Sequence, residues 1–204
     1  MFRKIKKLGR ISFYQFCRFI CFLTFQILWR LEVKGQKNVP RRGALILAAN
    51  HKSYADPPLV GVALPRVAHY LAKRSLFKFP PIGWLLKVWH SHPISRAGGA
   101  EAIKDAVDLM EEGDALIVFP EGKRIRGEEF GQPKPGVGML AMATKTPVIP
   151  VYVHNSNKMF KFKKLSVIFG QPIFPQDFHT YEKLAEEIMS AIVQLKESHF
   201  GKTS

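Results

Sequence analysis

The sequence predicts an α/β fold in which a mainly parallel central sheet is flanked by helices, with a separate helix in front of it. Two observations lead to this expectation. From about residue 43 onward, short apolar runs alternate with stretches of helical spacing, a pattern typical of a parallel sheet covered on both faces. The length of 204 residues suits one domain with a buried core. We therefore expect an N-terminal segment 1–42 and an α/β domain 43–204.

Five apolar runs in the α/β region are the expected strands. They cover 44–48, 66–72, 116–119, 148–153 and 165–169. Stretches with helical spacing lie between and after them, and the predicted helices cover 57–64, 98–110, 136–145 and 181–197. Gly113 is placed to stop the second of these helices. Sites in such sheets form where strands end and loops begin, so the residues after each strand are the ones to inspect for chemistry.

The net charge of +15, from 31 basic and 16 acidic side chains, predicts an anionic partner. Nucleic acid, an acidic membrane surface, or an acidic protein or phosphorylated substrate would each satisfy it. The two cysteines, Cys17 and Cys21, lie one helical turn apart in an apolar stretch. Two cysteines so placed exclude a disulfide framework and a cysteine zinc site, and they are typical of a reduced, cytoplasmic setting.

The N-terminal segment has the composition of a membrane-binding helix. An apolar run over 11–31 is rich in Phe, Ile and Leu and ends in Trp29 and Arg30, so a cleaved signal peptide is not expected. At about 100° per residue, one side of this helix is polar apart from Phe22 and the other is broadly apolar. The polar side consists of Ser12, Gln15, Arg18, Gln26 and Arg30, and the apolar side includes Phe13, Phe16, Cys17, Ile20, Leu23 and Ile27.

Basic residues flank this helix on both sides and favour an orientation parallel to the membrane surface. A spanning helix normally shows a charge difference between its ends, whereas symmetric positive flanks fit a helix in the interface of one anionic leaflet. We therefore expect a peripheral or monotopic protein on the cytoplasmic face of the cell membrane, with anionic lipids as partners. The alternative is a helix of the globular core, because amphipathicity alone does not separate the two.

The segment from Asn50 to Asp56 has the residue types of a general base and a group that orients it. His51 and Asp56 would point apart on a continuous helix, but Asp56-Pro57 is a natural helix start, and a turn there can bring the carboxylate back. A carboxylate that accepts from one ring nitrogen raises the basicity of the other. Since no elbow serine or cysteine is apparent, the nucleophile would be a substrate hydroxyl. The alternatives are a helix-capping Asp56 and a hydrogen-bonded loop histidine.

Four sequence blocks between about residues 43 and 155 carry a family resemblance. Asn50-His51-x-Ser53-x-x-Asp56 forms an NHxSxxD box, and Phe119-Pro-Glu-Gly-Lys-Arg124 is similar to an FPEGTR box. Between them, 70–96 is similar to a stretch that ends in a substrate arginine, and 148–152 follows as an apolar block with an internal proline. In this order, the blocks resemble the glycerophospholipid acyltransferase family, and more closely its bacterial 1-acylglycerol-3-phosphate acyltransferase branch.

The resemblance implies the glycerolipid acyltransferase fold and transfer of a fatty acyl group to 1-acylglycerol-3-phosphate (lysophosphatidic acid), giving phosphatidic acid. His51 would be the general base on the acceptor hydroxyl and Asp56 would orient it. The acyl donor would be a thioester of acyl carrier protein (acyl-ACP) or of coenzyme A (acyl-CoA), with no metal and no other cofactor. Arginine suits the acceptor phosphate because its planar fork can bind two oxygens. The implied substrate-binding residues are Asn50, Ser53, Lys73, Arg96, Glu121, Gly122 and Arg124.

Two departures from the family pattern leave the acceptor open. Lys123 stands where the family usually has Thr, and Ile125 stands where a small polar residue is common. Both lie in the box that would hold the acceptor, so they bear on the shape of that pocket and on the head group it takes. Another lysophospholipid is therefore an alternative substrate.

Other classes of protein compete with this interpretation. A non-enzymatic, basic protein that binds membranes or nucleic acid would share the charge, but no zinc-finger or RNA-recognition signature is present, so nucleic acid is not expected. A hydrolase of lipid esters would need a nucleophilic serine in a tight turn, which is not apparent. A catalytically inactive lipid-binding relative would not need both His51 and Asp56. A metal held by His51, His90 and His92 is disfavoured because no carboxylate cluster lies near them. The lysine- and phenylalanine-rich loop 158–164 fits anionic lipid, acyl carrier protein or plain solvent.

Overall fold

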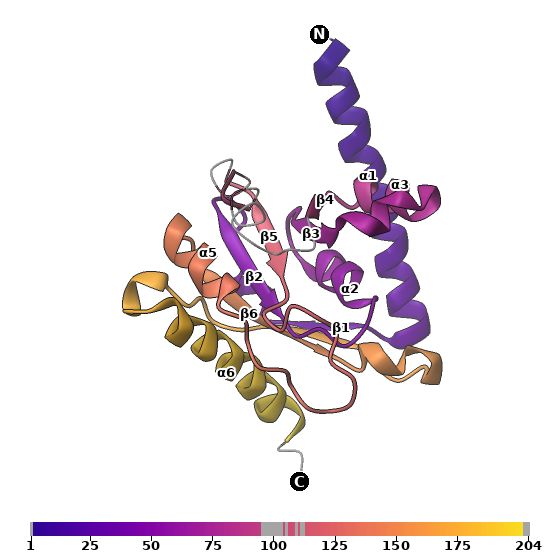
Figure 1. Cartoon of the computed structure of the whole chain (residues 1–204). Coiled ribbons are helices and arrows are strands. Elements are labelled where there is room, and N and C mark those ends of the chain that lie inside the picture. The colour runs from indigo at the N-terminus through magenta and orange to yellow at the C-terminus, as the bar shows by residue number, and fades with distance from the viewer. Residues whose placement is uncertain (1, 95–103, 105, 109, 111–112, 202–204) are drawn as a thin grey trace.

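The computed structural model describes residues 2–94, 104, 106–108, 110 and 113–201, and its centre is a seven-stranded sheet (Figure 1). The strand order is β1-β7-β6-β2-β5-β3-β4. All neighbouring strands are parallel except β6 and β7, which are antiparallel. The predicted mainly parallel sheet is therefore confirmed. The strands are β1 (Glu32–Lys34), β2 (Leu45–Ala49), β3 (His69–Lys73), β4 (Ser91–Ile94), β5 (Ala115–Val118), β6 (Val148–His154) and β7 (Ser166–Phe169).

Two strands of this sheet were not expected from the sequence. β1 is three residues long, comes from the segment before residue 43, and pairs with β7 at one edge. β4 forms the opposite edge and contains Pro93, which a strand tolerates where one side of it has no partner. Neither segment is long enough or apolar enough to stand out by periodicity.

Helices cover both faces of the sheet (Figure 1). They are α1 (Phe2–Trp29), α2 (Asp56–Ala63), α3 (Pro80–Val88), α5 (Gly136–Thr144) and α6 (Tyr181–Phe200), with short 3-10 helices η1 (Gln36–Asn38), η2 (Arg74–Lys78), η3 (Ser156–Lys161) and η4 (Pro175–Asp177). The helix predicted over 98–110 lies mostly outside the described residues, but 104, 106–108 and 110 are helical. Gly113, at φ 78°, donates its N–H to the Met110 carbonyl at 3.0 Å, as expected of a helix stop.

The sheet separates two apolar cores, and β2 shows how the sequence builds both. Leu45, Leu47 and Ala49 point into the core covered by α1 and α2. Ile46 and Ala48 point into the core covered by α5 and α6. All five side chains are 0% exposed, which explains why this strand is a continuous apolar run rather than an alternating one.

The face of α1 that packs on the domain overlaps the predicted polar side at Arg18 and Phe22, whereas Gln15, Gln26 and Arg30 of that side stay exposed. Tyr14 and Phe25 are buried in the first core, and Phe22 packs against it. Between them, an Nη2 N–H of Arg18 donates to the carbonyl of Leu64 at the end of α2. The opposite, apolar side stays exposed, with Phe16 60% and Ile27 74% exposed. The helix is thus docked on the core through one face and carries a second, unburied apolar face.

Among the described residues, no helix combines the length and the hydropathy that a bilayer span requires.

Candidate active site

His51 and Asp56 meet at the carboxyl edge of the sheet. His51 lies two residues after the end of β2, and Asp56 is the first residue of α2. The Nδ1 atom of His51 is 2.8 Å from Oδ2 of Asp56. Asp56 is 0% exposed, and the His51 side chain is 17% exposed. The turn between the two residues therefore pairs a buried carboxylate with a partly accessible imidazole.

The Asp56 carboxylate faces back along the chain instead of capping its own helix. Its Oδ2 atom accepts the backbone N–H groups of Lys52 and Ser53, each at 2.7 Å, in addition to the His51 ring. Its Oδ1 atom has no hydrogen-bond partner among the described residues. The negative charge sits at the N-terminal end of α2, where the helix dipole favours an anion. Asp56 thereby holds the whole 51–53 turn against the start of the helix.

The ring of His51 has a defined tautomer and orientation. An ionised carboxylate can only accept, so Nδ1 carries the hydrogen and Nε2 keeps its lone pair. The ring also stacks on Phe119, with 4.1 Å between ring centroids and 22° between planes. Nε2 is therefore the nitrogen left to take a proton from a substrate.

A cavity of about 270 Å³ lies beside His51 and is lined mainly by apolar side chains. Phe119 and Tyr54 are near His51 in its wall. The rest of the lining comes from α2, β3, η2, α3 and β4 and includes Tyr70, Ala72, Leu76, Leu85, Leu86 and Trp89. Such a space accommodates an apolar chain whose reactive end lies at the imidazole.

Asn50 and Glu121 are buried and hold the backbone around His51. Asn50 is 0% exposed; its amide oxygen accepts the Val153 N–H at 2.7 Å and its amide nitrogen donates to the Val153 carbonyl at 3.1 Å. Glu121 is 2% exposed and accepts the N–H groups of His51 at 2.7 Å and of Gly131 at 3.0 Å. Both side chains thus fasten β2 and the His51 turn to neighbouring strands and loops.

Ser53 and Gly122 shape the two turns that face each other at this edge. The Ser53 hydroxyl accepts the N–H of Ala55 at 3.2 Å. Gly122 has φ 66° and donates its N–H to the Phe119 carbonyl at 2.9 Å, a conformation that a side chain would strain. Three residues on, the Ile125 N–H donates to the His51 carbonyl at 2.8 Å, so the second turn is attached to the first.

Of the three expected phosphate-binding cations, the structure places Arg124 close to His51. Its guanidinium lies 3.5 Å from the centroid of the Tyr54 ring, and Tyr54 lines the cavity. Lys73 is the last residue of β3, but its side chain lies outside the described residues. Arg96 also lies outside them.

Sequence reasoning missed two residues that organise the site. Tyr54 occupies a variable position of the NHxSxxD box, so nothing in the pattern marked it as the ring beneath Arg124. Lys52 reaches across to the 127–129 loop, where its Nζ donates to the carbonyls of Gly127 and Glu129. Burial lowers the pKa of this ammonium, and nearby Glu121 and Glu128 act in the opposite direction.

His90 and His92 both contact the ring of His69. The Nε2 atom of His92 is 2.7 Å from Nδ1 of His69, whose Nε2 is 3.2 Å from a carboxylate oxygen of Asp114. Within the described ranges, no group of three or more His, Cys, Asp or Glu side chains is placed to hold a metal ion.

Comparison with known proteins identifies the family of this chain. A family model described as Acyltransferase matches residues 30–154. The 1-acyl-sn-glycerol-3-phosphate acyltransferase of Bacillus subtilis (strain 168) is 30% identical over 170 residues, which cover 81% of this chain and 84% of that protein. The protein of the same name from Borreliella burgdorferi is 31% identical over 136 residues, or 64% of this chain and 54% of that one.

A solved structure shares the fold. The crystal structure of the 1-acyl-sn-glycerophosphate (LPA) acyltransferase PlsC from Thermotoga maritima matches with a TM-score of 0.83 over 98% of this chain and 84% of that chain, at 23% identity. The structural match extends the likeness beyond the sheet to nearly the whole described fold. Since the family model covers more than half of the sequence and contains both His51 and Asp56, the chain belongs to the acyltransferase family.

Proposed function

We propose that the protein transfers a fatty acyl group from an acyl thioester to the free hydroxyl of 1-acyl-sn-glycerol-3-phosphate and so produces phosphatidic acid. The observation that carries the proposal is the 2.8 Å contact between His51 and a buried Asp56 beside an apolar cavity. The relatives from Bacillus subtilis and Borreliella burgdorferi are both named as 1-acyl-sn-glycerol-3-phosphate acyltransferases.

In the proposed mechanism, His51 is the general base. Nε2 takes the proton of the acceptor hydroxyl as its oxygen attacks the thioester carbonyl carbon. A C–O bond forms, the C–S bond breaks, and the proton passes from the imidazolium to the leaving thiolate. Asp56 stabilises the imidazolium through Nδ1 and keeps the tautomer correct throughout. No acyl-enzyme forms, because the attacking group belongs to the substrate.

The remaining site residues are assigned in two groups. Arg124, Lys73 and Arg96 bind the acceptor phosphate, as the family resemblance implies. Asn50, Ser53, Glu121 and Gly122 contribute by holding the two turns that carry His51 and Arg124, since their polar atoms contact backbone. The apolar cavity receives an acyl chain. The donor is an acyl carrier protein or coenzyme A thioester, and no further cofactor takes part.

The exposed apolar face of α1 is proposed to lie in the membrane interface. Phe13, Phe16, Phe19, Ile20, Leu23, Ile27 and Leu28 are each at least 36% exposed on this helix. An amphipathic helix with an unburied apolar face and basic flanks is typical of interfacial binding to an anionic leaflet. This arrangement makes the enzyme a peripheral or monotopic protein on the cytoplasmic face of the cell membrane, next to its lipid substrates.

A purified-enzyme assay tests the reaction. The full chain is given a panel of lysophospholipids, each with an acyl carrier protein thioester and with acyl-CoA, and product formation is measured. We expect turnover with lysophosphatidic acid that falls by about 10³-fold or more in His51→Ala and by about 10²- to 10⁴-fold in Asp56→Asn. An Asn at this position would bring its own amide N–H donors next to backbone N–H groups that now donate to the Asp56 carboxylate.

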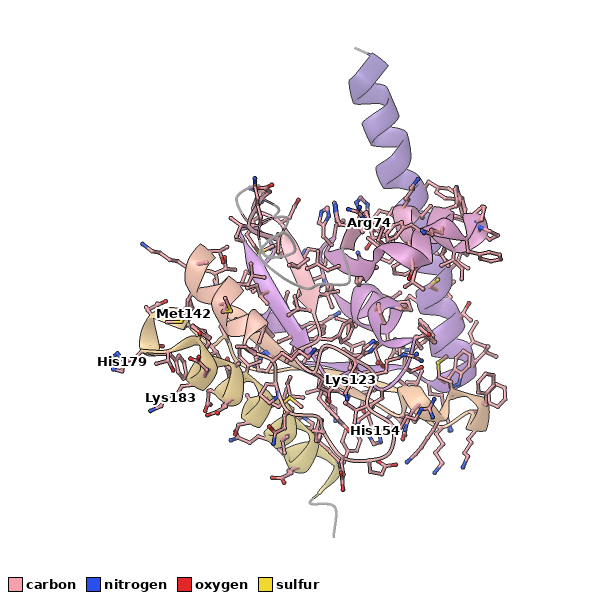
Figure 2. The ribbon with its side chains drawn as sticks, in the orientation of Figure 1. Arg74, Lys123, Met142, His154, His179 and Lys183 are labelled. Carbon is pink, nitrogen blue, oxygen red and sulfur yellow. The ribbon has the colours of Figure 1, made fainter. Side chains whose placement is uncertain are left out.

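His179→Ala is the matched control. His179 is exposed and lies near the start of α6, well to the left of Lys123 in Figure 2. Its loss should leave turnover unchanged. Full activity of His51→Ala would contradict the proposed mechanism. Activity with a different lysophospholipid, and none with lysophosphatidic acid, would keep the mechanism and replace the acceptor.

A further inference from the structure

The loop of residues 156–164, here called the Phe160 loop, exposes one aromatic ring almost fully and a second in part. Phe160 is 97% exposed, the largest exposed fraction among the large apolar side chains of the described residues, and Phe162 is 59% exposed. Isolated apolar side chains on a surface are ordinary, so the meaning of these two depends on how the loop is held and what lies beside it.

The Phe160 loop is fastened in the conformation that exposes these rings. Asn155 and Phe162 flank η3, just before and within the loop. Their φ values of 60° and 48° lie in the left-handed region, which is costly for a bulky residue such as Phe. The side-chain amide of Asn155 donates to the Lys164 carbonyl at 3.0 Å, and the Phe162 N–H donates to the Met159 carbonyl at 2.9 Å. A loop closed on itself in this way presents Phe160 outward as a constant feature.

Trp29 joins the Phe160 loop to the end of α1. The indole Nε1 donates to the Met159 carbonyl at 2.8 Å. The indole ring stacks on Phe162 with 5.8 Å between centroids and 11° between planes. Figure 1 shows this segment, in orange at the lower right, beside the C-terminal end of α1. The Phe160 loop therefore lies against the C-terminal end of α1, where the exposed residues Ile27 and Leu28 precede Trp29 in the chain.

Lysines alternate with the aromatic rings in this loop. Lys158 pairs with Glu128 at 2.5 Å, and Lys164 pairs with Glu32 at 3.2 Å. Lys161 and Lys163 are exposed, and neither has an acidic side chain within ion-pair distance among the described residues. The loop thus carries positive charge at the same edge as its apolar rings.

We propose that the Phe160 loop is a second lipid-binding element that inserts Phe160 into an anionic leaflet while Lys161 and Lys163 bind lipid phosphates. The proposal rests on the interfacial placement of α1 proposed above. An acidic protein partner would be attracted by the lysines alone, whereas an exposed ring beside the end of α1 gains free energy by leaving water for an apolar phase. Contacts at α1 and at this loop together set how the enzyme is oriented on the membrane.

A fluorescent label tests insertion directly. In the full chain with Cys17→Ala and Cys21→Ala, Phe160→Cys is labelled with an environment-sensitive dye and mixed with phosphatidylcholine vesicles, with or without phosphatidylglycerol. We expect a blue shift and brighter emission with the anionic vesicles. Lys183→Cys, on α6 away from this loop (Figure 2), is the matched control. Its dye should give the emission of a water-exposed label with both kinds of vesicle. A water-like signal from the label at residue 160 on floated protein overturns the proposal and leaves α1 binding intact. Protein that does not float overturns both.

Partition measurements on unlabelled protein test the charges. Lys161→Gln with Lys163→Gln should reduce partition onto phosphatidylglycerol vesicles about tenfold or more, and Phe160→Ser should reduce it several-fold. Lys145→Gln with Lys183→Gln removes the same charge from exposed positions outside the loop and should have a clearly smaller effect. Unchanged partition, combined with lost turnover from acyl carrier protein thioesters but not from acyl-CoA, would make the loop a protein-docking surface and refute lipid insertion.

Discussion

At the scale of single residues, the site around His51 uses one carboxylate to orient the imidazole and another to hold its backbone. Asp56 contacts the ring, and Glu121 accepts the His51 N–H. The two acids have different geometry, because Oδ2 of Asp56 accepts three donors while the two oxygens of Glu121 accept one backbone N–H each. Burial makes each contact strong and makes its loss costly.

Tyr54 is predicted to position Arg124 for the acceptor phosphate. The guanidinium lies over the Tyr54 ring at 3.5 Å, a cation–π contact of about 1 kcal/mol at an exposed site. Tyr54→Ala should therefore raise KM for lysophosphatidic acid roughly three- to tenfold with little change in kcat. Tyr54→Phe keeps the ring and should behave as the parent. Steady-state kinetics distinguish them, and equal KM values in both variants would show that the stacking plays no part.

At the scale of elements, α1 is held by a polar contact between two helix surfaces. Arg18 donates to the carbonyl of Leu64, one of the carbonyls left without a partner at the end of α2. The cationic head also complements the negative end of that helix. Arg18 thus acts as a capping group supplied from a helix 46 positions earlier in the chain.

Arg18→Met should loosen α1 from the domain. The substitution keeps an unbranched side chain but leaves the Leu64 carbonyl without its donor, so unfolding free energy should fall by about 1–2 kcal/mol. Urea titration followed by circular dichroism measures the change. Gln15→Ala removes only the 3.4 Å contact between Gln15 and Arg18 and serves as the control. A stability change as large in Gln15→Ala as in Arg18→Met would contradict the capping role.

The packing of α6 on β6 is predicted to weaken in acid through His154. The His154 ring stacks on Phe200, with 3.8 Å between ring centroids. Its Nδ1 accepts a hydrogen bond from the Tyr152 hydroxyl at 3.0 Å; this hydroxyl keeps its proton because burial raises the pKa of Tyr152. Burial lowers the pKa of His154, and Lys158 lowers it further. The unfolded chain therefore binds the proton first, and stability falls as pH drops from the ordinary histidine value toward the lowered one.

Thermal unfolding between neutral pH and about pH 5 tests this dependence, in the window where an ordinary histidine titrates. The parent should lose stability over that range, whereas His154→Asn should show a flatter profile from a lower starting stability. His179→Ala keeps the His154 contact and should follow the parent. An unchanged slope in His154→Asn would assign the acid sensitivity to another group.

At the scale of the whole molecule, the cavity and the apolar face of α1 are parts of one surface. Leu85 lines the cavity and is also 49% exposed, so the cavity wall reaches the outside at α3. The ring of Trp84 on the same helix contacts the ring of Phe13 on α1, with 6.0 Å between ring centroids. An acyl chain that enters beside α3 would therefore remain in apolar surroundings between the membrane interface and His51.

Ala72→Leu is predicted to shorten the acyl chain that the enzyme accepts. Ala72 lines the cavity from β3, and three added carbons would occupy part of the 270 Å³ space. Relative kcat/KM for long over short acyl donors should fall about tenfold, in line with the cost of one or two methylene groups in an apolar pocket. Ala72→Ser is nearly isosteric and should keep the parent preference. Competition between two donors of different length measures the ratio, and an unchanged ratio in Ala72→Leu would place the chain elsewhere.

Periodicity and motif spacing were enough to predict much of this protein. Apolar runs predicted β2, β5, β6 and β7 to within a residue or two, because a buried parallel strand is apolar on both faces. The Asp56-Pro57 helix start also predicted that the carboxylate would turn back to His51. These features are local, and their physical causes lie within a few residues of one another.

The tertiary structure alone decided the features that depend on distant partners. An amphipathic pattern could not say which side of α1 would meet the domain, because Arg18 finds its acceptor at Leu64. Nor could it show that Arg124 would lie on Tyr54 or that Glu121 would hold two backbone groups. The sequence by itself determined the buried central strands, several of the helices and the pairing of His51 with Asp56. Folding decided their contacts, because a hydrogen bond or an apolar face is satisfied by whatever the chain brings to it from elsewhere.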